Sequence, residues 1–178
     1  EARRGYGGII MRRRGRSNVK SGVVGSVANK LLSRLPDIPV ILAGVRRQNK
    51  RVLMAVNGPA AADRAVDMVT TLLGGYDYRI ELLHVVRNGA GGGTDAMPPD
   101  VVKSLTSDVE NRLKALKERL VGAGFDEALV SEKMIFDVVS RADAIVAEAE
   151  AQDCGTIVMG RKVASGPEDI ITGSVCSK

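Results

Sequence analysis

Short apolar runs alternate with segments of helical periodicity between residues 51 and 159, and this alternation most constrains the fold. The apolar runs have the length and composition of buried strands, and they cover residues 51–56, 79–86, 128–138 and 155–159. The segments between them carry apolar residues at helical spacing, over residues 60–73, 98–122 and 140–151. Strands that alternate with helices predict an α/β fold, an open, twisted parallel sheet with helices on both faces.

The longest predicted helix opens at Pro99 and is closed by Gly122 and Gly124. Its apolar positions recur at steps of three or four residues: Val101, Leu105, Val109, Leu113, Leu116 and Leu120. This spacing is typical of a helix that packs on a core along one face. The next helix is predicted to begin at Ser140, where Asp143 completes a variant of the capping box.

The four strand ends indicate where a ligand would bind. In an open parallel sheet, ligands lie beyond the carboxyl ends of the strands, where the strand order reverses. The residues at these ends are Asn57, Val85 with Val86, Val138, and Met159 with Gly160. We expect these points to converge on one crevice.

The composition excludes several functional classes. His84 is the only histidine, and Cys154 and Cys176 lie far apart, which excludes the common zinc spacings and a disulfide scaffold. No apolar run approaches the ~20 residues of a membrane span, and the absence of a disulfide framework predicts a cytoplasmic location. We name no catalytic residue and no metal ligand, because no side chain has the surroundings of a general base.

Positive charge is concentrated in the first part of the chain. Residues 1–50 hold 12 Lys and Arg against 2 Asp and Glu, whereas residues 51–178 hold 14 against 19, so the net charges are +10 and −5. The basic segment is interpreted either as a solvated loop or as a site for phosphate or another anion. Nucleic acid is the least favoured partner, because the chain has no Trp and few aromatic residues for base stacking.

The first part of the chain repeats the last part. Residues 8–11 (GIIM) match residues 156–159 (TIVM), and in each copy a Gly-Ser-Val sequence begins 14 positions after the methionine. The first copy continues with a predicted helix over residues 26–34 and a strand over residues 36–43.

We predict that residues 1–46 are the C-terminal part, strand–helix–strand, of a first unit. Residues 47–178 are predicted to be a second unit that lacks the end of its last helix and its final strand. As a further hypothesis, residues 8–43 complete the sheet that residues 51–159 begin.

Together these features resemble the universal stress protein family, whose pattern G-x2-G-x9-G-[S/T] follows the fourth strand. In the first copy the pattern falls on Arg12, Gly15, Gly25 and Ser26, and in the second on Gly160, Val163, Gly173 and Ser174. The resemblance extends from about residue 8 to residue 178. It implies a Rossmann-related parallel sheet of five strands, frequent binding of ATP, dimers formed through the last strand, and tandem domains.

The resemblance also implies which residues contact a nucleotide. By position, they are Asn57, Val85, Met159, Gly160, Val163, Gly173, Ser174 and Val175, together with Gly15, Gly25 and Ser26 of the first copy. Glycines let backbone N–H groups approach phosphate oxygens, and a Gly-Ser helix start adds free donors and the positive helix end. Mg²⁺ is expected only with the nucleotide.

Several positions differ from the family pattern. Asn57 stands where ATP-binding members have Asp, Val163 replaces a glycine of the phosphate loop, and Arg12 replaces the first glycine of the first copy. Glu168 and Asp169 add carboxylates near the loop, and like charges repel a triphosphate. The sequence therefore predicts a degraded phosphate motif.

We expect a stress-response or signalling module that binds ATP, AMP or another adenine nucleotide, and that forms a homodimer or pairs its tandem units. The alternatives are a dimerisation or regulatory domain that binds no nucleotide, and a slow ATPase. Other polar positions have a structural interpretation. His84 is predicted to be a strand residue, the cysteines small apolar fillers, and charges such as Glu118 and Glu148 solvated helix faces.

Overall fold

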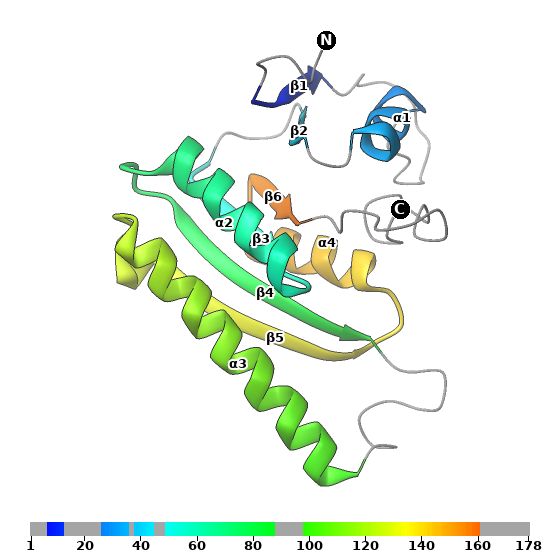
Figure 1. Ribbon diagram of the computed structural model, residues 1–178, viewed down its shortest axis with the longest axis vertical. Helices are drawn as coiled ribbons and strands as arrows, with labels where there is room; N and C mark the ends of the chain where they lie inside the picture. The colour runs from blue at the N-terminus through cyan, green and yellow to red at the C-terminus, as the bar shows by residue number, and fades with distance from the viewer. Residues whose placement is uncertain (1–6, 13–25, 36–37, 45–48, 88–97, 161–178) are drawn as a thin grey trace. The chain divides into compact units, whose positions relative to one another are not determined.

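The computed structural model describes residues 7–12, 26–35, 38–44, 49–87 and 98–160 (Figure 1). These residues fall into two compact units, one over residues 7–44 and one over residues 49–160.

The larger unit alternates strands and helices as the sequence predicts. Its elements are β3 (Arg51–Ala55), α2 (Pro59–Leu73), β4 (Arg79–Arg87), α3 (Pro99–Gly122), a 3-10 turn η2 (Glu127–Leu129), β5 (Val130–Val138), α4 (Arg141–Ala151) and β6 (Thr156–Met159). Local signals set several boundaries. Pro59 and Pro99 stand in the first turn of their helices, and the Ser140 side chain accepts a hydrogen bond from the Asp143 N–H at the start of α4.

The strands form one parallel sheet in the order β5-β4-β3-β6. From β3 the chain moves outward to β4 and β5, and then returns across the sheet to place β6 on the other side of β3. The strand order therefore reverses between β3 and β6, which is the point where open α/β sheets bind ligands. The predicted α/β fold with a parallel sheet is confirmed.

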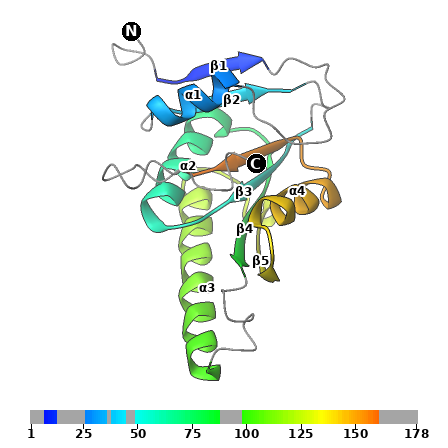
Figure 2. The same ribbon diagram turned by 90° about the vertical axis from the view of Figure 1, so that its right-hand side faces the viewer.

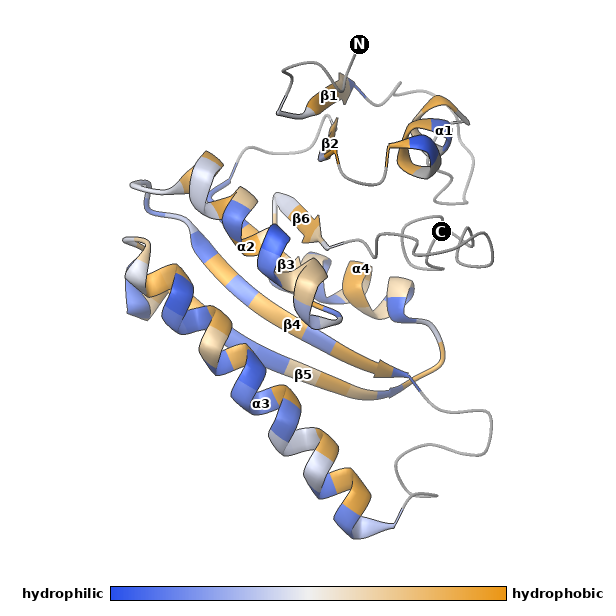
Figure 3. Cartoon of the chain, in the orientation of Figure 1, coloured by the Kyte–Doolittle hydropathy of each residue, from blue (hydrophilic) through white to orange (hydrophobic). Residues whose placement is uncertain are grey.

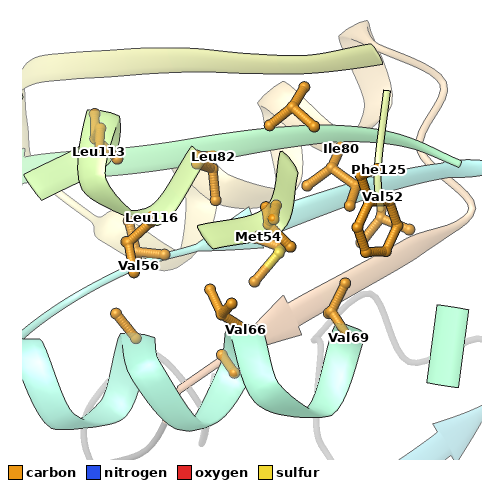
Figure 4. Close-up of a cluster of buried hydrophobic side chains, with 14 residues drawn as sticks. Val52, Met54, Val56, Val66, Val69, Ile80, Leu82, Leu113, Leu116 and Phe125 are labelled. Atoms are coloured by element: carbon orange, nitrogen blue, oxygen red, sulfur yellow. The ribbon is translucent and has the colours of Figure 1, made fainter. Parts of the chain in front are cut away.

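Helices α2 and α3 cover one face of this sheet. Met54 of β3 and Leu82 of β4 are fully buried there, and Figure 4 shows Met54 above Val66 and Val69 of α2. Helix α3 packs into the same core with Leu113, Leu116 and Leu120. A guanidinium links the two helices: Arg119 donates to Asp63, and also to Asp67 at 2.7 Å.

The apolar stripe of α3 is only partly buried, which corrects the expectation that it packs on the core throughout. Val101 and Leu105 are 45% and 49% exposed, whereas Leu113, Leu116 and Leu120 are buried. Figure 2 shows the first half of α3 extending past β4 and β5, so the sheet offers it no partner there. The interleaved hydrophobic and hydrophilic residues of α3 are visible in Figure 3. No helix in the described part of the chain combines the length and apolarity needed to cross a membrane.

Helix α4 covers the opposite face (Figure 2). Leu53 and Leu83 are fully buried there beside Ile145 and Ala149 of α4. Glu148 is buried with them, at 7% exposure, so the interpretation of Glu148 as a solvated helix charge is wrong. Glu118 on α3 is exposed, as expected.

The smaller unit consists of β1 (Ile9–Arg12), α1 (Ser26–Arg34) and β2 (Val40–Ala43). The strands pair in parallel, with Ile9 opposite Val40, and α1 covers the predicted range. However, β1 and β2 form a two-stranded sheet of their own. In the described part of the chain, the strands of each unit pair only within that unit, so the completion of the larger sheet by residues 8–43 stays a hypothesis.

Candidate functional site

The carboxyl edge of the larger sheet brings four of the predicted site residues together. Ala55 is in register with both Leu83 and Met159, so the chain leaves β3, β4 and β6 at one edge. Asn57 follows β3 and is exposed, Met159 and Gly160 end β6, and the Val85 side chain is buried near the end of β4. The register thus places these strand ends along one edge of the sheet, and their convergence on one crevice, with Val138 of β5 as the fourth point, stays a prediction.

Gly160 lies against the first turn of α2. A Cβ atom added to Gly160 would stand 2.2 Å from the carbonyl oxygen of Ala61 and 2.5 Å from its carbonyl carbon. Only glycine allows this close approach of two backbones, because every other residue adds a Cβ that must clash. The glycine at this position therefore lets the end of β6 pack directly on the first turn of α2.

The start of α2 has donors to offer at this edge. Gly58 adopts a φ of +69°, which glycine favours, and no side chain among the described residues caps the helix. Pro59 lacks an N–H group, so the free donors of the first turn belong to the residues that follow it. The N-terminal end of a 15-residue helix also carries partial positive charge, which favours a negative group nearby.

His84 is a residue of β4 near the same edge of the sheet. Its Nδ1 is 2.9 Å from the carbonyl oxygen of Val56. A carbonyl oxygen only accepts, so Nδ1 carries the proton and Nε2 is the acceptor in the neutral ring. Burial lowers the pKa of His84, and the nearby guanidinium groups of Arg141 and Arg112 lower it further, although the hydrogen bond to Val56 opposes this. His84 is thus a strand residue, as predicted, and its lowered pKa favours the neutral ring.

Arg141 was not identified from the sequence. It is the first residue of α4, and its Nε donates to the carbonyl oxygen of Val85 at 3.3 Å. This bond ties the start of α4 to the end of β4, and it places a permanent positive charge close to His84. The one available signal was the position of Arg141 directly after the capping residue Ser140.

We expect His84 to titrate below its ordinary pKa of 6.5. The unfolded chain then binds more protons than the folded chain, so stability falls as the pH drops from about 6.5 toward the lowered folded pKa. Because the chain has a single histidine, one ring resonance in a proton NMR titration measures the value directly. His84→Gln keeps an N–H donor for Val56 and should remove this part of the pH dependence. A ring that titrates at or above 6.5 would contradict the structure.

The side chains of the other predicted site residues lie outside the part of the chain that the structure describes. Val163, Gly173, Ser174, Val175, Gly15 and Gly25 lie outside the described residues. Ser26 begins α1 in the smaller unit, and its side chain also lies outside them. The structure therefore brings together Asn57, Val85, Met159 and Gly160, and it adds His84 and Arg141 to them.

Comparisons with known proteins give a family and a fold. The model of the universal stress protein family matches residues 48–178. Hypothetical protein MJ0577 is 21% identical, with a TM-score of 0.57 over 71% of this chain and 84% of that one. A universal stress protein in complex with cAMP is 20% identical, with a TM-score of 0.52 over 70% and 85%. Protein Rv1636 from Mycobacterium tuberculosis H37Rv is 23% identical, with a TM-score of 0.50 over 73% and 85%. No curated protein matches the chain.

Proposed function

Because the chain belongs to the universal stress protein family, we propose that it binds an adenine nucleotide at the carboxyl edge of its sheet and acts as a stress-response signalling module. The observation that carries the proposal is the close packing of Gly160 on the first turn of α2. No side chain among the described residues caps this helix, and Asn57, which precedes it, is exposed. This arrangement leaves backbone donors and a positive helix end at the point where the strand order reverses.

Each described residue has a role in this proposal. The Asn57 amide offers one donor group and one acceptor to the hydroxyl groups of a ribose. The end of β4 near Val85 supplies an apolar support for the base, and Arg141 holds the Val85 carbonyl in place. Gly173 and Ser174 would supply phosphate contacts, as the family resemblance implies. Mg²⁺ would enter only with a nucleotide that carries several phosphates.

A structural neighbour supports the choice of ligand. The universal stress protein that was solved in complex with cAMP shares this fold, and its ligand is an adenine nucleotide. A fold shared at 20% identity does not transfer the ligand by itself, so the proposal rests on the residues of this chain.

The proposal predicts that Gly173→Val weakens the binding of ADP by at least about tenfold, which corresponds to about 1.4 kcal/mol. A branched side chain would block the approach of phosphate oxygens to backbone N–H groups. Isothermal titration calorimetry of the purified chain measures the effect. Gly122→Ala is the matched control, because a Cβ at Gly122 meets no atom within 4 Å. Equal affinities of the wild-type chain and Gly173→Val would refute the assignment of the phosphate site.

We also propose the domain organisation that the repeat indicates. Residues 1–46 would be the C-terminal strand–helix–strand of a first unit, and residues 47–178 the second unit. The parallel β1–α1–β2 arrangement supports this, because α1 begins at the Ser of a Gly-Ser-Val sequence, as the repeat predicts. A homodimer or a pair of tandem units is the assembly proposed with it.

A further inference from the structure

A charged cluster lies on the face of the sheet that α4 covers. Glu81 comes from β4, Lys133 from β5, and Glu148 and Gln152 from α4 and its C-cap. The Lys133 Nζ lies 2.7 Å from each carboxylate oxygen of Glu148, and the Gln152 Nε2 donates to Glu148 Oε1 at 2.9 Å. The Glu148 side chain is 8% exposed and that of Lys133 is 41% exposed, so the pair connects α4 to the sheet with its carboxylate buried and its ammonium group partly open to solvent.

Glu81 adds a second carboxyl group to a cluster that holds one lysine. Its Oε1 is buried and has no hydrogen-bond partner among the described residues. If both carboxyl groups were ionised, two negative charges would face one ammonium group in a poorly solvated place. Such an arrangement is costly, and two carboxyl groups that share a site normally retain a proton between them.

The residues directly opposite Glu81 on the two neighbouring strands carry no charge to balance it. Leu53 lies opposite it on β3 and Ser131 on β5, and neither is charged. Cys154, which follows α4, is near enough for Glu81 to help burial raise the pKa of its thiol. Arg51, at the start of β3, directs its guanidinium to the carbonyl oxygen of Gln152 at 3.0 Å.

The pKa values of the two carboxyl groups move in opposite directions. Burial raises the pKa of Glu81 and the neighbouring Glu148 raises it further, although Lys133 opposes them. Burial alone would raise the pKa of Glu148, but hydrogen bonds from Lys133 and Gln152 outweigh it, so this pKa is lowered. Glu148 is therefore the member of the pair that loses its proton at the lower pH, and Glu81 is the member that keeps its proton to the higher pH.

We propose that Glu81 and Glu148 share one proton, and that this proton holds helix α4 against the sheet. With the proton present, the Glu81 hydroxyl can donate to Glu148, and the cluster is a neutral combination of one acid, one carboxylate and one ammonium group. When the proton leaves to water, the two carboxylates repel each other and α4 loosens. Because Arg141 of α4 holds the Val85 carbonyl, the loosening reaches the edge of the sheet described above.

The sign of the pH dependence follows from the raised pKa of Glu81. A group with a raised folded pKa stabilises the fold fully below its unfolded value, and this contribution is lost as the pH rises through the folded pKa. The lowered pKa of Glu148 acts oppositely, because its ion pair is lost only as the pH falls through that lower value. The attachment of α4 is thus strongest between the lowered pKa of Glu148 and the raised pKa of Glu81, and it weakens as the pH rises through the folded pKa of Glu81.

Hydrogen exchange of the full chain across a pH series tests the proposal. In the wild-type chain, the protection factors of α4 amides should fall relative to those of α2 as the pH rises, by about tenfold for each unit of difference between the folded and unfolded pKa. Glu81→Gln carries no charge at any pH and should keep α4 protected throughout. Glu132→Gln on β5 is the control, because Glu132 is exposed, and its profile should match the wild type.

A measurement on the unaltered chain keeps the proposal testable if the variant does not fold. The carboxyl carbon of Glu81, followed by carbon-13 NMR, should titrate above the ordinary pKa of 4.5 and shift together with the signal of Glu148. Titration of Glu81 at its ordinary pKa would overturn the proposal. An α4 profile in Glu81→Gln that runs parallel to the wild type would also overturn it.

Discussion

Replacing Gly160 with alanine is expected to lower the free energy of unfolding by more than about 3 kcal/mol. The new Cβ would stand 2.2 Å from the Ala61 carbonyl oxygen and 2.5 Å from the Ala61 carbonyl carbon. Both are backbone atoms, which cannot rotate away as a flexible side chain can. Either β6 moves from β3 or the first turn of α2 moves from the sheet. Urea denaturation followed by circular dichroism measures the loss.

The matched control is Gly122→Ala at the end of α3, where a Cβ meets no atom within 4 Å. Alanine also favours a helix more than glycine does, so this variant should be as stable as the wild type or slightly more stable. A Gly160→Ala chain that retains full stability would show that β6 does not approach α2 as the structure describes.

Replacing Leu82 with alanine is expected to cost about 2–5 kcal/mol of stability. Leu82 is fully buried in the central strand β4, between the sheet and helices α2 and α3. Removing its side chain takes apolar surface from the core and leaves a cavity that close-packed neighbours fill only in part. Denaturant unfolding gives the value, and an unchanged slope with denaturant would show that the two-state comparison holds.

Leu105→Ala makes the same chemical change on the exposed half of α3. Leu105 is 49% exposed, so the loss should stay below about 1 kcal/mol. Equal costs at Leu82 and Leu105 would mean that the first half of α3 is covered in solution, or that β4 is not central. Either outcome would contradict the fold described here.

Periodicity predicted the helices and strands well, because each element buries its own apolar positions. It failed for the first half of α3, where Val101 and Leu105 continue the stripe but the sheet does not continue beneath them. Spacing along a helix indicates which face is apolar, but it carries no information on how far the partner surface extends.

The burial of Glu148 was missed although a signal existed. Ile145, Glu148 and Ala149 stand at positions i, i+3 and i+4, so Glu148 lies on the buried stripe of α4. A charge on that stripe needs a partner, and Lys133 comes from a strand that sequence spacing does not connect to α4. Such a pair depends on the tertiary arrangement and could not be predicted from either segment alone.

Part of the candidate site could likewise be predicted from the sequence, and part depends on the tertiary structure. Asn57, Met159 and Gly160 were predicted because strand ends of a parallel sheet share one edge, a rule that needs only the order of the elements. The contacts of His84 with Val56 and of Arg141 with Val85 depend on the register of β3, β4 and α4. Sequence spacing does not fix that register.

Titrating the nitrogen-15-labelled chain with ADP and following its amide resonances tests directly whether an adenine nucleotide binds at this edge. We expect saturable shifts that cluster at Asn57, the end of β4 near Val85, and Gly160, with the opposite edge of the sheet unchanged. An unchanged spectrum at millimolar ADP would contradict the claim, and so would shifts confined to residues away from the carboxyl ends of the strands.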